Sequence, residues 1–453
     1  MWSIDKVRLK PDPTYKRGLY VGSAFRRISV VGSFRRISVV GSAFRGTVLA
    51  AVAIALVSLE LRVSSHETLT TTVLFDREIV RVLNAHCVMC HVENGPSFPL
   101  ATYEQAWVQG RKIRSDVIAR HMPPWAAFPG YGRFANDNSL TLRESQFIVS
   151  WVEGLGPRNA GKVFLNVADA GGPRPPAVRA RADFDRWQLG TPGALHQLPA
   201  STVEAKGPDE VRHLVIDLGL TTARSIRGLE YKPGDRRVVR AAFFTLQETG
   251  QWLGSWTPWY GFTALPAGVA HVLPPGSHIV AEIHYRGTGG RVVDRGALGL
   301  FFAEQARPAP ASGLVIEAKG DVPPGAMARK FRATSRVTSD SYVLAMRPEV
   351  SPGVTTIEVS ARRPDGGTDV LLFAKDIPLD WPTPYILKDP VLVRRGTDLS
   401  ATAYYANSGG APLAGGIRLT VSRYAATGRA QRRSAPVRGR ANATAASPRS
   451  PSR

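Results

Sequence analysis

The sequence predicts a chain of several domains, in which a small all-α domain precedes two all-β sandwiches of the jelly-roll kind. Three observations predict this. Apolar residues recur at helical spacing through residues 67–157, a stretch rich in Pro and Gly follows at 158–181, and short β-rich runs separated by Gly, Pro and Asp fill residues 182–423. About 240 residues suffice for two tandem sandwiches. We place them at residues 182–306 and 313–423.

The N-terminal residues divide into a basic extension, 1–45, and an export segment, 46–65. Residues 21–45 repeat a Gly-Ser-Phe-Arg motif, with Ala after Ser in two of the three copies, every nine to ten residues, which is too short for a solenoid unit. The extension is either a disordered basic arm on an anionic membrane surface or the result of a start codon assigned too far upstream, and we favour the second interpretation. The apolar run 47–59 has the length of a signal-peptide core. We therefore expect a periplasmic or otherwise extracytoplasmic protein, secreted or membrane-anchored through this run.

Cys87, Cys90 and His91 have the spacing C-x-x-C-H, and the chain contains no other cysteine. This pattern is typical of one covalently bound haem c, because two such thiols can form thioethers to the vinyl groups of a porphyrin and the adjacent imidazole can bind the iron. A zinc site would need further ligands at workable spacing. A redox dithiol would favour a βαβ setting over the helical pattern that ends here. Covalent haem attachment and export support each other.

Three helical patterns make up the predicted α domain. One ends at the motif, one spans residues 103–120, and the last begins with the capping box of Thr141 and Glu144 and ends near Gly154 and Gly156. The side chains expected to face its core are Phe75, Ile79, Val82, Leu83, Ala106, Trp107, Ile113, Val117, Phe147, Ile148 and Trp151.

Met122 is the candidate for the second axial ligand of the haem iron. Pro123 and Pro124 prevent the preceding helix from continuing and hold Met122 on a stiff extended segment, and a thioether sulfur is a known haem ligand. His121 is the competing ligand, and a packing methionine at a helix end is the structural alternative. The remaining methionines are Met1, Met89, Met327 and Met346.

The net charge of +22 lies mostly at the two ends of the chain. Residues 424–453 carry Arg, Ala, Ser and Pro without apolar periodicity and are predicted to be a disordered basic tail. No nucleic-acid recognition motif accompanies the charge, and the weakly basic body suits docking to an acidic redox partner protein. Strands are expected at residues 212–218, 238–245, 278–284, 354–362, 369–373, 399–406 and 417–421.

Several segments carry a specific resemblance: the haem motif and residues 122–125, 134–137, 185–190, 233–239, 273–277, 284–285 and 363–367. Through them, residues 67–410 resemble bacterial proteins that join a cytochrome c domain to a domain similar to copper type II, ascorbate-dependent monooxygenases, the peptidylglycine and dopamine monooxygenase kind. The resemblance implies two tandem jelly-roll-like sandwiches with a copper at each.

The copper ligands of that family do not carry over. The family has a His-His pair where this chain has Arg240 and Ala241. It has Pro-His-Met-His where residues 348–351 of this chain are Pro-Glu-Val-Ser. A late Met-containing segment of the family is missing from this chain. His284 remains as a residual copper-ligand position, and one imidazole cannot hold a copper. A rebuilt site with His271 and His278 is the alternative, since 278 and 284 share one face of a strand.

The sequence thus predicts an exported c-type cytochrome that carries single electrons through one haem, with a degenerate, non-catalytic monooxygenase-like β domain and no copper. We expect redox partner proteins and no catalytic residues. The rival hypothesis is a copper-dependent monooxygenase whose rebuilt copper site is fed by the haem. A peroxidase or gas sensor would require an open sixth position on the iron.

Overall fold

The computed structural model describes residues 71–159, 186–305 and 307–426. All of them belong to one compact unit, residues 68–453. The predicted extension and export segment lie outside the described residues, as do most of the predicted linker and most of the predicted tail. The last strand nevertheless continues to Ala425, two residues into the segment predicted as tail.

The helices lie between residues 75 and 153. No helix among the described residues is long and apolar enough to cross a membrane. Nine of the eleven side chains predicted for their core are buried, with Ile79, Leu83 and Ile148 almost fully enclosed, while Phe147 is partly buried and Trp107 is not part of the core. The bounds are η1, a π-helical turn, Phe75–Ile79; α2 Val80–His86; α3 Tyr103–Val108; α4 Gly110–Ile118; and α5 Leu142–Glu153.

Two details of the helical prediction are wrong. The single helix predicted at 103–120 is two helices, because the backbone leaves helical geometry at Gln109, next to the point where Gly110 packs against Val152 of α5. Trp107 is 41% exposed instead of buried. Its ring covers Trp151 from outside at 6.2 Å between ring centroids. The capping box of Thr141 and Glu144 is present as predicted.

The rest of the described chain is β structure, so the prediction of a chain dominated by β-sandwich sheets is confirmed. The strands of the first half are β1 Ala194–Gln197, β2 Ser201–Val203, β3 Glu210–Asp217, β4 Arg224–Lys232, β5 Val239–Leu246, β6 Trp252–Trp256, β7 Phe262–Ala264, β8 Val269–Leu273, β9 His278–Tyr285, β10 Val292–Asp294 and β11 Ala297–Phe302. Those of the second half are β12 Ala309–Val322, β13 Arg329–Arg336, β14 Ser341–Glu349, β15 Val354–Arg362, β16 Thr368–Lys375, β17 Tyr385–Val393, β18 Asp398–Tyr405 and β19 Leu413–Ala425.

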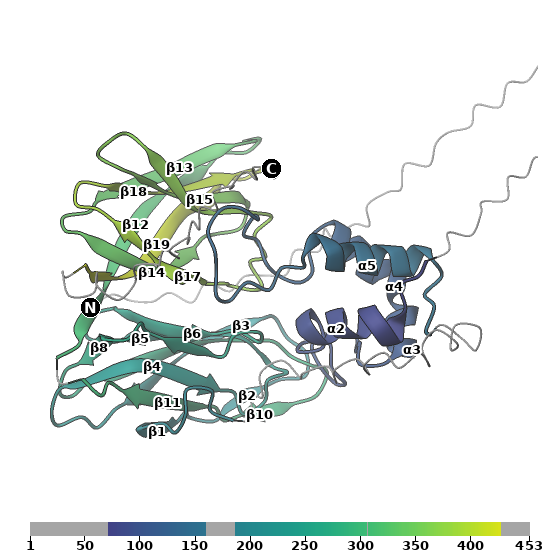
Figure 1. Ribbon diagram of the computed structural model, residues 1–453, viewed down its shortest axis with the longest axis horizontal. Coiled ribbons are helices and arrows are strands. Elements are labelled where there is room, and N and C mark those ends of the chain that lie inside the picture. Colours follow the sequence, from purple (N-terminus) through teal and green to yellow (C-terminus); the bar gives the residue numbers. More distant parts are fainter. Residues whose placement is uncertain (1–70, 160–185, 306, 427–453) are drawn as a thin grey trace, which may run out of the picture. The chain divides into compact units, whose positions relative to one another are not determined.

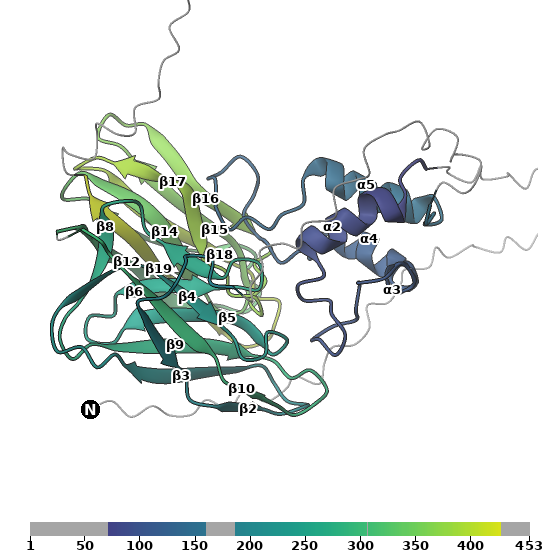
Figure 2. The ribbon, with the colours of Figure 1, turned by 60° about the horizontal axis from the view of Figure 1, so that its bottom comes forward.

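The strands form layered sheets (Figures 1 and 2). One long sheet has the order β1-β11-β4-β8-β12-β19-β14-β17, with β7 also paired to β4. The sheet β3-β9-β5-β6 packs against strands β4 and β11 of the long sheet and encloses one buried cluster. The sheet β13-β18-β15-β16 packs against strands β12, β19, β14 and β17 of the long sheet and encloses another. The long sheet runs through both halves because β12 pairs in parallel with β8 at Ala309 and Val269.

Side-chain alternation explains these strands locally. In β9, residues 278–285 alternate between half-buried and buried, as expected for a strand with one face on a core. Strand β5 is buried along nearly its whole length, which is typical of a central strand covered on both faces. Its Arg240 is therefore a charged side chain inside an otherwise apolar strand.

The segment between α4 and α5 belongs to the second β core and not to the helical one. Trp125 and Phe134 are buried in the cluster formed by β12 and β14–β19. Backbone bridges join Ala127 to Ala374 and Phe134 to Leu387. The segment that follows Met122 is thus fixed by two strands more than 230 residues further along the chain, β16 at Ala374 and β17 at Leu387.

Asn136 fastens this segment. Its buried side chain donates from Nδ2 to the carbonyl oxygen of Pro384 at 2.7 Å and accepts at Oδ1 from the amide of Ile386 at 3.0 Å. The indole Nε1 of Trp259 donates to its backbone carbonyl oxygen at 3.1 Å.

We predict that Asn136→Ala lowers the free energy of unfolding by about 2–4 kcal/mol, because it leaves a buried amide and a buried carbonyl without partners. The neighbouring Asp137→Ala is the control, since Asp137 is exposed and its carboxylate accepts only the local amide of Ser139. Urea unfolding followed by tryptophan fluorescence measures both. Equal losses in the two variants would contradict the anchoring role of Asn136.

Candidate functional site

The predicted haem motif lies in a tight turn after α2. The amides of Cys90 and His91 both donate to the carbonyl oxygen of Cys87, at 3.1 and 3.0 Å. This turn brings both thiols and the imidazole to the wall of one cavity, and Met122 lines the same cavity. The structure therefore brings together all four residues predicted to bind the haem. His121 is exposed and does not line the cavity.

His91 is arranged as an imidazole with one free nitrogen. It is 9% exposed, and its Nδ1 lies 2.8 Å from the carbonyl oxygen of Phe98. Since a carbonyl can only accept, Nδ1 carries the proton and Nε2 is left with its lone pair. Burial lowers the pKa of His91, against the opposite effect of the bond to Phe98. A neutral imidazole held through Nδ1 is the form that binds iron through Nε2.

The two thiols are free and partly buried. Burial raises the pKa of Cys87 and of Cys90 to about 12. The nearby charge of Glu144 adds to the effect at Cys87, while the charge of Arg236 opposes it at Cys90. Across the part of the chain that the structure describes, no three His, Cys, Asp or Glu side chains gather as metal ligands. The zinc alternative therefore has no assembled ligand set here.

His86 and Asn138 complete the helical side of the cavity. The Nδ1 of His86 lies 3.3 Å from the carbonyl oxygen of Asn138, and its Nε2 lies 3.3 Å from Oε1 of Glu144. Glu144 also closes the capping box of α5. Its pKa is lowered although burial acts to raise it, because Thr141 and His86 donate to the carboxylate.

One strand and several connecting segments of the β structure, all distant in sequence, supply the opposite wall of the cavity. Arg240, Trp259, Arg286, Asp380 and Trp381 all line it. Sequence reasoning missed these residues, because nothing local to the haem motif predicts which strands approach it. One signal was present in the sequence: Arg240 interrupts an apolar run, and a charge in a buried strand needs a partner.

The residual copper-ligand position, His284, lies at a different cavity with Glu282 and Arg347. Its Nε2 is 2.7 Å from Oε1 of Glu282, and Nη2 of Arg347 donates to both carboxylate oxygens of Glu282 at 2.8 and 2.9 Å. The guanidinium also lies 3.8 Å above the ring of Phe243. A fixed positive charge beside His284 opposes binding of a metal cation there.

The three histidines considered for a rebuilt copper site do not meet. His278 and His284 do share one face of β9, but six residues of strand separate them by roughly 20 Å. His278 instead pairs with Glu248 at 3.0 Å. His271 is buried elsewhere, bonded through Nδ1 to Gln251, and burial lowers its pKa to about 4.

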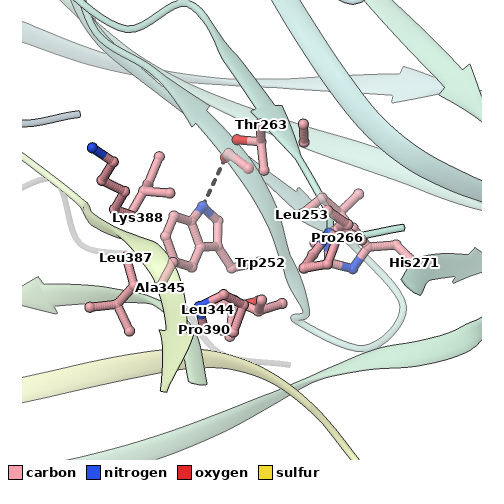
Figure 3. Close-up of a pocket in the computed structure, with 15 residues that line it drawn as sticks. Trp252, Leu253, Thr263, Pro266, His271, Leu344, Ala345, Leu387, Lys388 and Pro390 are labelled. Atoms are coloured by element: carbon pink, nitrogen blue, oxygen red, sulfur yellow. Dashed lines mark hydrogen bonds between the residues drawn. The ribbon is translucent and has the colours of Figure 1, made fainter. Parts of the chain in front are cut away.

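His271 lines a further cavity of about 330 Å³, which the sequence did not predict. Figure 3 shows Trp252 and Leu253 from one half of the β structure facing Leu344 and Leu387 from the other. The indole Nε1 of Trp252 donates to the carbonyl oxygen of Gly254 at 2.8 Å, so its polar atom is satisfied. The wall is mainly apolar, with few polar groups to orient a ligand.

Comparisons with known proteins do not assign this site. No family model matches the chain, and no curated protein matches it. Among solved structures, the major capsid protein P2 from bacteriophage PM2 is 10% identical, covering 51% of this chain and 97% of its own, with a TM-score of 0.25. The glycosylasparaginase PNGase F from Flavobacterium meningosepticum is 13% identical, covering 49% and 96%, with a TM-score of 0.23. Scores this low carry no argument about function.

We predict that Glu282→Gln destabilises the protein at neutral pH, and progressively less as the pH falls from 4.5 toward 2. Burial acts to raise the pKa of Glu282, but the bond to His284 and the charge of Arg347 outweigh it and hold the pKa at about 2. A lowered carboxyl pKa contributes stability that is complete above its unfolded pKa of about 4.5 and is lost as pH falls toward 2. The expected loss at pH 7 is about 2–3 kcal/mol.

Chemical unfolding of both proteins at pH 7, 5, 4 and 3 measures this difference. Glu248→Gln is the control, because Glu248 makes a similar pair with His278 at the other end of the strand but is exposed. Its removal should cost less than about 1 kcal/mol. A Glu282→Gln deficit that stays constant from pH 7 to pH 3 would rule out the ionised pair as its source.

Proposed function

We propose that this chain is an exported c-type cytochrome that carries single electrons. Cys87 and Cys90 would each add their S–H bond across one vinyl group of a single haem, and His91 and Met122 would hold the iron from its two sides. The bound haem would supply the reversible one-electron chemistry. The partners would be redox proteins that meet the weakly basic body of the chain outside the cytoplasm.

The observation that carries the proposal is the common cavity of these four side chains. The chemistry of the donors supports it as well. Nδ1 of His91 donates a hydrogen bond to the carbonyl oxygen of Phe98, so Nε2 is the nitrogen left to bind iron, and both thiols are free to form thioethers. Met122 rather than His121 is on the cavity wall, which favours a thioether as sixth ligand and a higher reduction potential than two imidazoles would give.

The β part would serve as a non-catalytic scaffold, with its fold proposed as two jelly-roll-like sandwiches. Arg347 beside His284 and the separation of His271, His278 and His284 favour this over a monooxygenase with a rebuilt copper centre. The helical region, residues 75–153, would be the cytochrome c domain.

The first test is spectroscopic. Protein produced with a haem c attachment system should carry one covalent haem, seen by intact mass and by the pyridine haemochrome. Its ferric form should show the weak near-infrared band of Met-to-iron ligation, which Met122→Ala should abolish. Met327→Ala is the control, because Met327 is 85% exposed and remote from the cavity. Absence of covalent haem in the native chain, or a high-spin native spectrum, would refute the proposal.

The second test is elemental. Mass spectrometry of metals in the purified protein should find about one iron per chain and no stoichiometric copper, because the guanidinium of Arg347 lies in the cavity of the candidate copper position, bonded to Glu282. One or two coppers that survive dialysis would support the monooxygenase instead. The result should hold after incubation with Cu(II) followed by gel filtration.

A further inference from the structure

We infer that Arg240 and Arg286, which belong to the β structure, bind the propionate carboxylates of the haem, so that the sandwich completes the cofactor site. This inference rests on the proposed function and extends it to residues far from the haem motif. Arg240 lies on β5, and Arg286 directly follows β9. Both line the cavity that also holds Cys87, Cys90 and Met122.

Arg240 is a buried cation whose hydrogen-bond donors are only partly used by Asp380. The residue is 3% exposed. Its Nη1 donates to the backbone oxygen of Asp380 at 2.8 Å and to the carboxylate Oδ2 at 2.9 Å, and its guanidinium stacks over Trp381 at 4.3 Å. Its Nε is buried and has no hydrogen-bond partner among the described residues. Asp380 engages only Nη1, so this guanidinium on the cavity wall keeps donor capacity for a further anionic oxygen.

The charges around the cavity point to the same class of ligand. Of the ionised side chains on the wall, two are arginines and one is an aspartate. That aspartate, Asp380, is about half exposed and is shared, since its Oδ2 also lies 3.6 Å from Nη2 of Arg286. Arg286 pairs in addition with Asp209 at 2.7 Å.

A third cation lies close by, because Nη2 of Arg236 donates to the carbonyl oxygen of Pro258, next to Trp259 on the cavity wall. The wall opposite the haem motif is therefore net positive. Planar guanidinium groups match carboxylates geometrically and can bind them with two parallel hydrogen bonds. A haem attached at Cys87 and Cys90 would bring carboxylates of its own into this cavity, and they would offer further anionic oxygens to Arg240 and Arg286.

The test uses the haem-loaded protein and its Arg240→Gln variant. Loss of a positive charge next to the haem should disfavour the reduced form, lowering the equilibrium constant for reduction by roughly three- to tenfold. The propionate bending band in the resonance Raman spectrum should shift as well, because it reports on hydrogen bonds to the carboxylate. Arg240→Lys keeps the charge and should restore most of the reduction equilibrium.

Arg212→Gln is the matched control. Arg212 also pairs with a carboxylate, Glu210, and lies over an aromatic ring, Tyr285, but it does not line the cavity. It should change neither readout. Arg286→Gln, at a residue whose side chain is 33% exposed, should give the same two changes at smaller size and decides the matter if Arg240→Gln does not fold.

The two proposals fail in different ways. If the native chain takes up no covalent haem, the proposed function is refuted and this inference with it. If the haem is attached with normal axial ligation, but the Raman band and the reduction equilibrium of Arg240→Gln or Arg286→Gln match those of Arg212→Gln, the inference alone is refuted. The arginines would then be a structural ion-pair cluster with Asp380 and Asp209.

Discussion

The candidate site depends on one constraint, the insertion of the segment after Met122 into the second β core. Trp125 and Phe134 pack against Tyr385 with ring centroids 5.3 Å apart in each pair. Burying two such aromatic side chains contributes about 2–3 kcal/mol each. Only Pro123 and Pro124 separate Met122 from Trp125, so the position of the candidate sulfur ligand follows from the packing of a β-sandwich.

This constraint explains why the helical region cannot be understood as an isolated unit. The helices hold Cys87, Cys90 and His91, while the segment with Met122 ends in contacts to β16 and β17. Asn136 reinforces the connection by bonding to residues on either side of Tyr385. Three cores of the same compact unit therefore set the cavity walls: the helical core at the haem motif, the second β core at Met122, and the first β core at Arg240 and Arg286.

Features encoded locally were predictable from the sequence. The capping box of α5 and strands such as β9 and β15 follow from short-range patterns and match their predicted positions within two residues. Features that depend on packing between distant parts of the chain were not predictable from the sequence. Trp107 fits the inward face of one continuous helix, but the break at Gln109 ends that helix and leaves its ring on the surface. Periodicity has no information about such a break, because it arises where α4 meets α5.

The same distinction applies to the cavity walls. The motif of Cys87, Cys90 and His91 is contiguous and needs no fold to be recognised, whereas Trp259 and Trp381 reach the cavity only through the sheet topology. Trp381 also lines the cavity of Glu282, His284 and Arg347. At the cavity of the haem motif Arg240 stacks on Trp381, and at the cavity of His284 Arg347 stacks on Phe243. Each cavity thus has a buried guanidinium held against an aromatic ring. Cationic side chains therefore line both cavities. Beside His284 the charge disfavours a free metal cation, and beside the haem motif it favours anionic oxygens.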